Sequence, residues 1–230
     1  MTSRLAIVAS LIGFPLFSIA GQRGQPAGDL LAADPGRLTV LNVAATRVQY
    51  RGRDAIRLVA KPTDSVSKET IAIIKGAEFG DGVIEAEIAG APATGADTSA
   101  RGFVGIAFRV DSSGTRYAAF YLRPTNGRAT DQLRRNHATQ YIAHPDYPWN
   151  RLRKEQPGVY ESYVDLEPGA WTPIRIEVRG GAARLFVRGS PQPVLIVNDM
   201  KNPPASGRIA LWIDTGTEAY FSRLRVTPAR

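Results

Sequence analysis

Both histidines of the chain lie in one aromatic and arginine-rich stretch, residues 135–155 (RNHATQYIAHPDYPWNRLRKE). An imidazole titrates near neutral pH, so His137 and His144 are candidates for proton transfer or metal binding. Their separation of seven residues puts them on opposite faces of a strand. On a helix they would lie ~10 Å apart along the axis, too far for one metal. We therefore expect no shared metal ion, and we favour His144, at a strand end beside Pro145, as the catalytic candidate.

Acidic residues in two predicted strands supply further candidates. In YESYVDL, Glu161 and Asp165 share a strand face but lie ~13 Å apart, beyond the roughly 5–10 Å that separates the carboxyls of a glycosidase. Either could instead pair with a carboxylate or with His144 on a neighbouring strand, and we favour Glu161 with His144. Glu85 and Glu87, about 7 Å apart on one face of GVIEAEIAG, are the alternative catalytic pair. All of these carboxylates have a simpler interpretation as charges on solvated strand faces.

Aromatic and arginine side chains gather in and beside the irregular stretch between Pro124 and Tyr160. Sugars present apolar C–H faces that stack on aromatic rings, and arginine binds carboxylate groups with two parallel hydrogen bonds. These residues therefore predict carbohydrate binding with a preference for acidic sugars. Alternatively, Tyr147 and Trp149 only fold the stretch back onto the protein. The predicted binding residues are Arg109, Tyr121, Arg123, Arg134, Arg135, Gln140, Tyr147, Trp149, Arg151 and Tyr163.

Short strands must position these side chains. Hydrophobic residues make up 43% of the 230 residues and charged residues 22%, the composition of a globular protein. Apolar and polar residues alternate in runs such as PIRIEVR and AARLFVR, and Gly180-Gly181 between these two runs is typical of a hairpin turn. A dozen or so such runs, spaced by about 8–12 residues, predict one antiparallel sandwich or barrel. The chain has no cysteine, and its length suffices for a core without disulfides.

The N-terminus predicts export. Arg4 precedes the apolar run LAIVASLIGFPLFSIA, and Ser18 and Ala20 suit the −3 and −1 positions of a cleavage site. We expect a signal peptide over residues 1–20, a polar linker over 21–34 and a single domain over 35–228, in a secreted protein that is periplasmic or extracellular. If the segment stays uncleaved, it is a membrane anchor.

The formal net charge of +8 comes mostly from arginine. Such a charge favours an anionic partner, although the arginine codons of a GC-rich genome explain it equally well. We expect no nucleic-acid partner, because an exported protein rarely meets nucleic acid and the sequence carries no nucleic-acid-binding signature.

Four phrases, FGDGVIEAEIAG, RGFVGIAFRV, YAAFYLRP and the closing GRIALWIDTGTEAYFSRLRVT, resemble secreted proteins with the concanavalin A-like jelly roll. That group includes laminin-G-like domains, bacterial glucanases and domains similar to 3-keto-disaccharide hydrolases. The resemblance covers roughly residues 35–228 and implies an all-β fold of two antiparallel sheets, the concave one often carrying a glycan or a catalytic site. The E-x-D-x-x-E strand of the glucanases is missing, and FVGIAFR lacks the serine-glycine that the hydrolase-like group has there. The resemblance thus implies the fold and not an activity.

Three functions agree with this sequence. The leading one is a secreted carbohydrate-binding sandwich for acidic polysaccharides. The alternatives are a glycoside hydrolase or related lyase, and a structural or protein-binding laminin-G-like module. No cofactor is expected. Calcium is common in the fold that the chain resembles, and DSSGT and VNDM could supply oxygen ligands, but they lack EF-hand spacing and we assign none. The sequence gives no signal for the oligomeric state.

Overall fold

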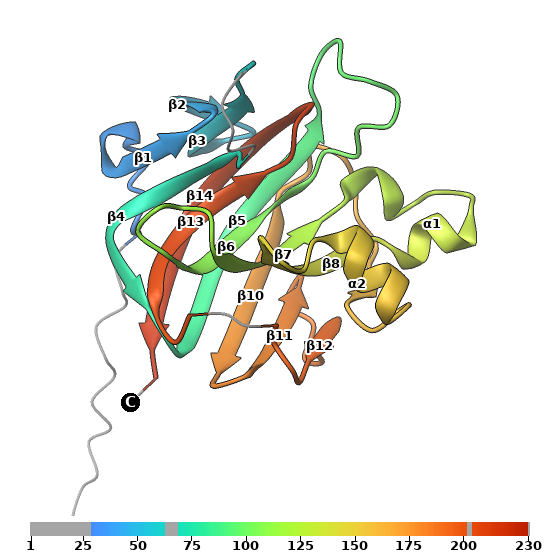
Figure 1. The fold of residues 1–230 in the computed structure, drawn as a ribbon. Helices are drawn as coiled ribbons and strands as arrows, with labels where there is room; N and C mark the ends of the chain where they lie inside the picture. The colour runs from blue at the N-terminus through green and yellow to red at the C-terminus, as the bar shows by residue number, and fades with distance from the viewer. Residues whose placement is uncertain (1–28, 63–68, 202–203, 230) are drawn as a thin grey trace, which may run out of the picture.

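Two antiparallel sheets of seven strands each pack face to face in this protein (Figure 1). The structure is a computed structural model that describes residues 29–62, 69–201 and 204–229. The predicted all-β sandwich is confirmed. The predicted signal peptide lies outside the described residues. None of the described helices is long and apolar enough to cross a membrane.

Sheet A carries the candidate site. Its strands, in spatial order, are β1 (Leu38–Leu41), β4 (Ile71–Phe79), β13 (Gly207–Ile213), β6 (Val104–Val110), β7 (Tyr117–Leu122), β8 (Thr139–His144) and β9 (Glu161–Ser162). Sheet B follows the order β12 (Leu195–Val197), β11 (Ala182–Val187), β10 (Thr172–Arg179), β5 (Gly82–Pro92), β14 (Thr217–Pro228), β3 (Arg53–Ala60) and β2 (Val43–Tyr50).

In sheet B, the alternation of apolar and polar residues in the sequence corresponds to the buried and outward faces of the strands. In β10, Ile174, Ile176 and Val178 are buried in the main core between the sheets. Arg175 and Glu177 between them point outward, because successive side chains of a strand lie on opposite faces. The predicted hairpin at Gly180-Gly181 joins β10 to β11.

Sheet A is buried on both faces over its middle strands. In β7, Phe120 belongs to the main core, whereas Tyr117, Ala119 and Tyr121 belong to a second apolar cluster on the outer face. This cluster also contains Trp212 of β13. The middle of the outer face is therefore apolar and covered, so a polar binding site must lie at an end of the sheet.

The long irregular stretch contains more regular structure than predicted. Two short helices, α1 (Gln132–Asn136) and α2 (Trp149–Glu155), flank β8, and a 3₁₀ turn lies at Pro124–Asn126. A further 3₁₀ turn lies outside this stretch, at Pro35–Arg37 before β1. Figure 1 shows α1 and α2 together beside β7 and β8. They form one rim of sheet A at the end where β7 finishes and β8 begins.

Candidate functional site

One row of side chains crosses the outer face of sheet A near this rim. Trp212 pairs with Gly105, Gly105 with Tyr121, Tyr121 with Gln140, and Gln140 with Glu161. Directly opposed residues of neighbouring strands share a face. Strand register therefore gathers groups from β13, β6, β7, β8 and β9 in one line.

Arg123 follows β7 and lies above this row. Its Nη2 donates to the Tyr121 hydroxyl at 2.8 Å and to Gln140 Oε1 at 3.0 Å, and its Nη1 donates to the His137 carbonyl at 3.0 Å. The side chain is 5% exposed. Burial raises the pKa of Tyr121 to about 12, so this hydroxyl stays neutral beside the cation. Arg123 is a fixed cation rather than a mobile surface group.

Glu161 is a buried carboxylate, 4% exposed, surrounded by cations. Arg153 Nη2 lies 2.6 Å from its Oε2, and His137 Nε2 lies 3.1 Å from its Oε1. Arg123 Nη1 is 3.9 Å away. Burial lowers the pKa of His137, and Arg153 and Arg123 act in the same direction against the opposing effect of Glu161. Because a buried charge requires compensation, Glu161 holds these groups in place.

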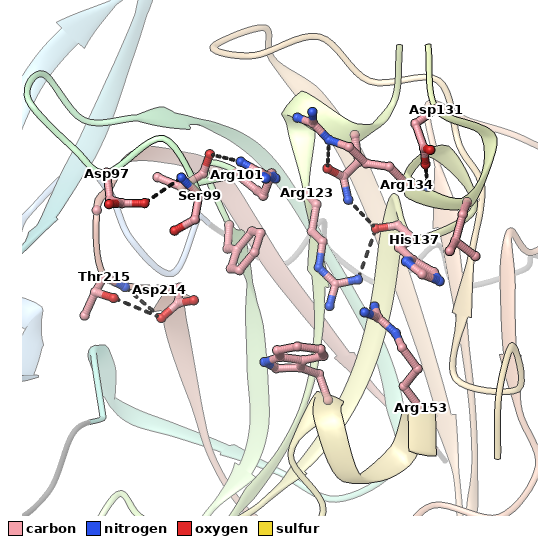
Figure 2. Close-up of a pocket in the computed structure, with 16 residues that line it drawn as sticks. Asp97, Ser99, Arg101, Arg123, Asp131, Arg134, His137, Arg153, Asp214 and Thr215 are labelled. Atoms are coloured by element: carbon pink, nitrogen blue, oxygen red, sulfur yellow. Dashed lines mark hydrogen bonds between the residues drawn. The ribbon is translucent and has the colours of Figure 1, made fainter. Parts of the chain in front are cut away.

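A pocket of about 790 Å³ opens beside this network. Figure 2 shows Asp97 and Asp214 on one side of it and His137 and Arg153 on the other. Its walls come from segments far apart in the sequence, chiefly residues 97–103, 123–137, 149–153 and 214–216.

Backbone hydrogen bonds join these segments. Ala93 N donates to the carbonyl of Gly216 at 2.9 Å, and Thr125 N donates to the carbonyl of Arg101 at 3.4 Å. The Asp131 carboxylate accepts from Arg134 N at 2.6 Å and caps the N-terminus of α1. The pocket therefore lies on anchored loops.

Trp149 begins α2, lines the pocket and is 42% exposed. The Arg153 guanidinium lies 4.8 Å from the ring centroid, one helical turn further on. Such cation–π contacts hold a ring in one orientation. The pocket thus has an exposed, positioned aromatic surface.

Arg101 and Arg134 also line the pocket, and neither forms an ion pair within the ranges that the structure describes. Arg101 Nη1 donates to the Thr98 carbonyl at 2.7 Å, and Arg134 Nε donates to Asn126 Oδ1 at 3.0 Å. Burial and the nearby Arg134 lower the pKa of Arg101. The carboxylate of Asp97 acts on the pKa of Arg101 in the opposite direction, but it forms no ion pair with this guanidinium. Two neighbouring guanidinium groups without ion-pair partners in the described ranges favour an anion between them.

Asp214 follows β13 and lies on the side of the pocket opposite His137 and Arg153 (Figure 2). Its Oδ1 accepts from Thr215 N at 2.8 Å. Burial raises the pKa of this carboxyl, and the hydrogen bonds from Thr215 only partly offset the effect. Asp214 is thus the carboxyl of this pocket whose environment most favours the protonated form.

A second pocket of about 570 Å³ adjoins the first and shares Leu133, His137 and Arg153 with it. Glu161 and Tyr163 line this second pocket.

His144 and Glu161, predicted to work together, are not brought together. Glu161 pairs with Gln140 and His144 with Tyr117, at opposite ends of β8. His144 Nδ1 lies 3.0 Å from Glu69 Oε1, and its ring stacks on Tyr117 with centroids 5.0 Å apart. His137 takes the place beside Glu161, and no sequence signal identified this pair.

The alternative pair, Glu85 and Glu87, lies on β5 in sheet B. Glu87 forms ion pairs with Arg53 and, at 3.3 Å, with Arg223. Ile84 and Ala86 on the same strand face the main core, so both glutamates point outward on the far side of the sandwich.

Arg109, predicted to bind ligand, is buried and lines neither pocket. It is 4% exposed, and its guanidinium donates to Asp81 Oδ1 at 2.6 Å and to the carbonyls of Gly80 and Gly180 at 3.1 and 3.0 Å. Its φ of 53° lies at an irregularity of β6, and its side chain contacts the β4–β5 connection and the β10–β11 hairpin turn.

The other predicted binding residues divide into three groups. Arg123, Arg134 and Trp149 line the first pocket and Tyr163 the second. Tyr121 and Gln140 are buried beneath Arg123, and Arg135 contacts Tyr163. Arg151 lies over Tyr147, its guanidinium 4.2 Å from the ring centroid, and pairs with Glu155. The sequence assigned no role to Asp97, Arg101, Arg153 or Asp214 of the first pocket, and it favoured His144 over His137.

Across the described ranges, no three histidine, aspartate or glutamate side chains gather as a metal site would require. In DSSGT, Asp111 accepts from Ser113 Oγ at 2.8 Å. In VNDM, Asp199 accepts from the Tyr160 hydroxyl at 2.8–2.9 Å. Donors of the protein thus occupy both aspartates, and calcium binding stays a prediction.

No family model and no curated protein matches this sequence. A Parabacteroides distasonis structure, named as a candidate glycosyl hydrolase, superposes with a TM-score of 0.50 at 10% identity over 85% of this chain and 89% of its own. The carbohydrate-binding module CBM66 of Bacillus subtilis gives 0.49 at 10% identity, covering 81% and 95% of the two chains. The β-glucanase of Bacillus licheniformis gives 0.43 at 14%, covering 82% and 83%. With two seven-stranded antiparallel sheets, the chain folds as a concanavalin A-like jelly-roll sandwich.

Proposed function

We propose that this protein binds carbohydrate in the first pocket and prefers acidic poly- or oligosaccharides. One observation carries the proposal: the exposed side chain of Trp149 shares an open pocket with Arg101 and Arg134, two arginines that form no ion pair within the described part of the chain.

The indole supports sugar binding because it offers a flat apolar surface to the C–H face of a pyranose. Arg153 and Arg123 lie over this ring, with guanidinium carbons 4.8 and 5.8 Å from its centroid. The ring is thus ordered before a ligand arrives, so binding costs little side-chain entropy.

The pocket offers partners to both kinds of polar group on an acidic sugar. Asp97 and Asp214 can accept from hydroxyl groups, while Arg101 and Arg134 can donate to a carboxylate. A neutral sugar would leave the arginines without an anion. A uronic acid provides partners for the carboxylates and the arginines, which supports the acidic preference.

Export to the periplasm or the extracellular space belongs to the same proposal. It is supported by the charged start, apolar run and small residues of residues 1–20.

The test is binding of the purified protein to polygalacturonate and alginate, with dextran as the neutral control, measured by affinity electrophoresis and calorimetry. We expect acidic polymers to bind more tightly, and Trp149→Ala to lower that affinity at least about tenfold. Ile196→Ala, which removes a 47% exposed apolar side chain from β12, is the matched control and should bind like the wild type. Binding that survives Trp149→Ala would remove this pocket from the proposal.

Hydrolysis of a glycosidic bond is a second candidate, favoured by one observation. Asp214 is a half-buried carboxyl in the wall of the pocket with a raised pKa, and in its protonated form it could donate a proton to a leaving oxygen. Release of new reducing ends from a bound polymer, abolished in Asp214→Asn with binding retained, would establish it. Binding without release would leave a carbohydrate-binding protein. Failure to bind any glycan would favour the protein-binding module.

A further inference from the structure

We propose that the second pocket is a further subsite of the same groove, so that the ligand is an oligosaccharide running from Trp149 across His137 and Arg153 to Tyr163. This inference rests on the proposed function, because it places further units of the same acidic chain.

The two pockets adjoin. Leu133, His137 and Arg153 line both of them, so a chain that passed from one pocket to the other would cross these three side chains. Their volumes are about 790 and 570 Å³. Each lies within the ~300–1,000 Å³ typical of small-molecule sites, so one sugar unit would leave most of the combined space empty.

Each pocket has its own exposed aromatic ring. Tyr163 is 44% exposed, close to the 42% of Trp149. The Arg135 guanidinium lies 5.2 Å from the Tyr163 ring centroid, and its Nη2 is 3.3 Å from the hydroxyl. Arg135 therefore fixes the ring, and the exposed part remains available to a second pyranose. A sugar polymer repeats its apolar face along the chain and can use both rings.

The boundary between the pockets is rigid and polar. Glu161 accepts from Arg153 at 2.6 Å and lies 3.1 Å from His137 Nε2, so one buried carboxylate holds both boundary residues. Asn136 lines the second pocket, and its Oδ1 accepts from Gln132 at 2.7 Å. The amide nitrogen of Asn136 can then donate to a sugar hydroxyl.

The experiment is calorimetric titration with oligogalacturonates, and with oligouronates cut from alginate, from the disaccharide to the octasaccharide. We expect the wild-type affinity to rise at least about tenfold between the disaccharide and the hexasaccharide, since a second stacked ring contributes that factor. Tyr163→Ala should remove the gain for the hexasaccharide and leave the disaccharide within about twofold. Trp149→Ala should weaken both lengths.

Two further variants test the Tyr163 ring and the Asn136 amide separately. Tyr163→Phe keeps the ring and should keep the gain with length. Asn136→Ala, an exposed substitution, should weaken the hexasaccharide about threefold and spare the disaccharide, as loss of one neutral hydrogen bond predicts. Circular dichroism checks that each variant is folded. The dependence of affinity on oligosaccharide length is measured on the wild type, so this part of the test does not depend on the folding of any variant.

The outcomes separate the two proposals. Equal wild-type affinity for all lengths, or a Tyr163→Ala protein that retains the gain with length, would overturn the second subsite. Binding that still depends on Trp149 would then leave the proposed function intact. Absence of binding at every length would overturn the proposed function and the second subsite with it.

Discussion

The indole of Trp212 and the phenol ring of Tyr121 stack across Gly105, with centroids 4.6 Å apart and ring planes 23° apart. They belong to β13 and β7, and β6 runs between these strands. Gly105 pairs in register with both residues, and its missing side chain leaves the space in which the rings meet. Since Tyr121 accepts from Arg123, this stack supports the central cation of the pocket.

Gly105→Ala should therefore damage the fold. A Cβ atom there would collide with the carbonyl oxygen of Phe120 and lie 2.6 Å from Tyr121 Cβ. We expect a loss of about 3 kcal/mol in the free energy of unfolding, because backbone on a neighbouring strand cannot move aside. Urea unfolding measures it. Gly181→Ala is the control, with no atom within 4 Å of its Cβ, and should change stability by less than about 1 kcal/mol. Equal effects of the two substitutions would contradict this explanation.

Arg109 should contribute to stability and not to binding. Arg109→Ala would remove the guanidinium that donates to the carbonyls of Gly80 and Gly180 and would leave Asp81 without its cationic partner, at a cost of about 3 kcal/mol. The control is Arg47→Ala. Arg47 is 63% exposed and lies 3.5 Å from Asp54, so its loss should cost less than about 0.5 kcal/mol. Denaturant unfolding and polysaccharide binding are both measured, and weaker binding by a folded Arg109→Ala protein would return Arg109 to the binding surface.

Much of the fold could be predicted because strands encode their burial locally. The alternation of Ile174, Ile176 and Val178 with charged residues identifies β10 and its buried face. The helices could not be predicted in this way, since α1 has five residues and α2 seven, too few to show a 3.6-residue period. The predicted strand over residues 160–166 shortens to Glu161–Ser162, because after these two residues the chain leaves the sheet.

The candidate site could be predicted only in part, because some of its residues are brought together by the order of the strands in the sheet. Trp149, Arg123 and Arg134 stand out by residue type in a long irregular stretch. Asp214 and Arg101 reach the same pocket through strand order, which places β13 beside β6. Pairings of that kind depend on tertiary register, and no spacing in the sequence encodes them.

His137 should make stability depend on pH below neutrality. Burial holds its pKa below the ordinary value, so the unfolded chain binds a proton first as the pH falls. The stabilisation is fully present above about pH 6.5 and is lost as the pH drops toward the pKa of the folded state. The free energy of unfolding should decrease as the pH is lowered from about 7.5 to 5.5, and this dependence on pH should be weaker in His137→Gln. An imidazole pKa at or above the ordinary value, from NMR titration assigned with that variant, would contradict the prediction.

Asp214 should give folding stability a pH dependence opposite to that given by His137. Burial raises its pKa, so its ionised form is less favourable in the folded protein than in the unfolded chain. Its stabilising effect is present below the unfolded pKa and is lost as the pH rises through the folded one. Asp214→Asn should therefore unfold at a higher urea concentration than the wild type at neutral pH. The difference should shrink as the pH falls toward the ordinary pKa of an aspartate, because protonation removes the cost of the buried charge. A variant that is less stable at both pH values would show that the carboxylate is favoured in the fold.

Arg101 and Arg134 should make binding of acidic polymers sensitive to charge and salt. Each has a guanidinium in the first pocket without an ion-pair partner in the described ranges, so a bound carboxylate gains a charge-assisted contact from each. We expect Arg101→Gln and Arg134→Gln each to weaken polygalacturonate binding about fivefold, and the double variant to flatten its dependence on sodium chloride. Arg47→Gln, on the exposed edge strand β2 of sheet B, is the matched control and should leave both affinity and salt dependence unchanged. If the two pocket variants weakened a neutral polymer as much as an acidic one, these arginines would support the shape of the pocket rather than recognise an anion.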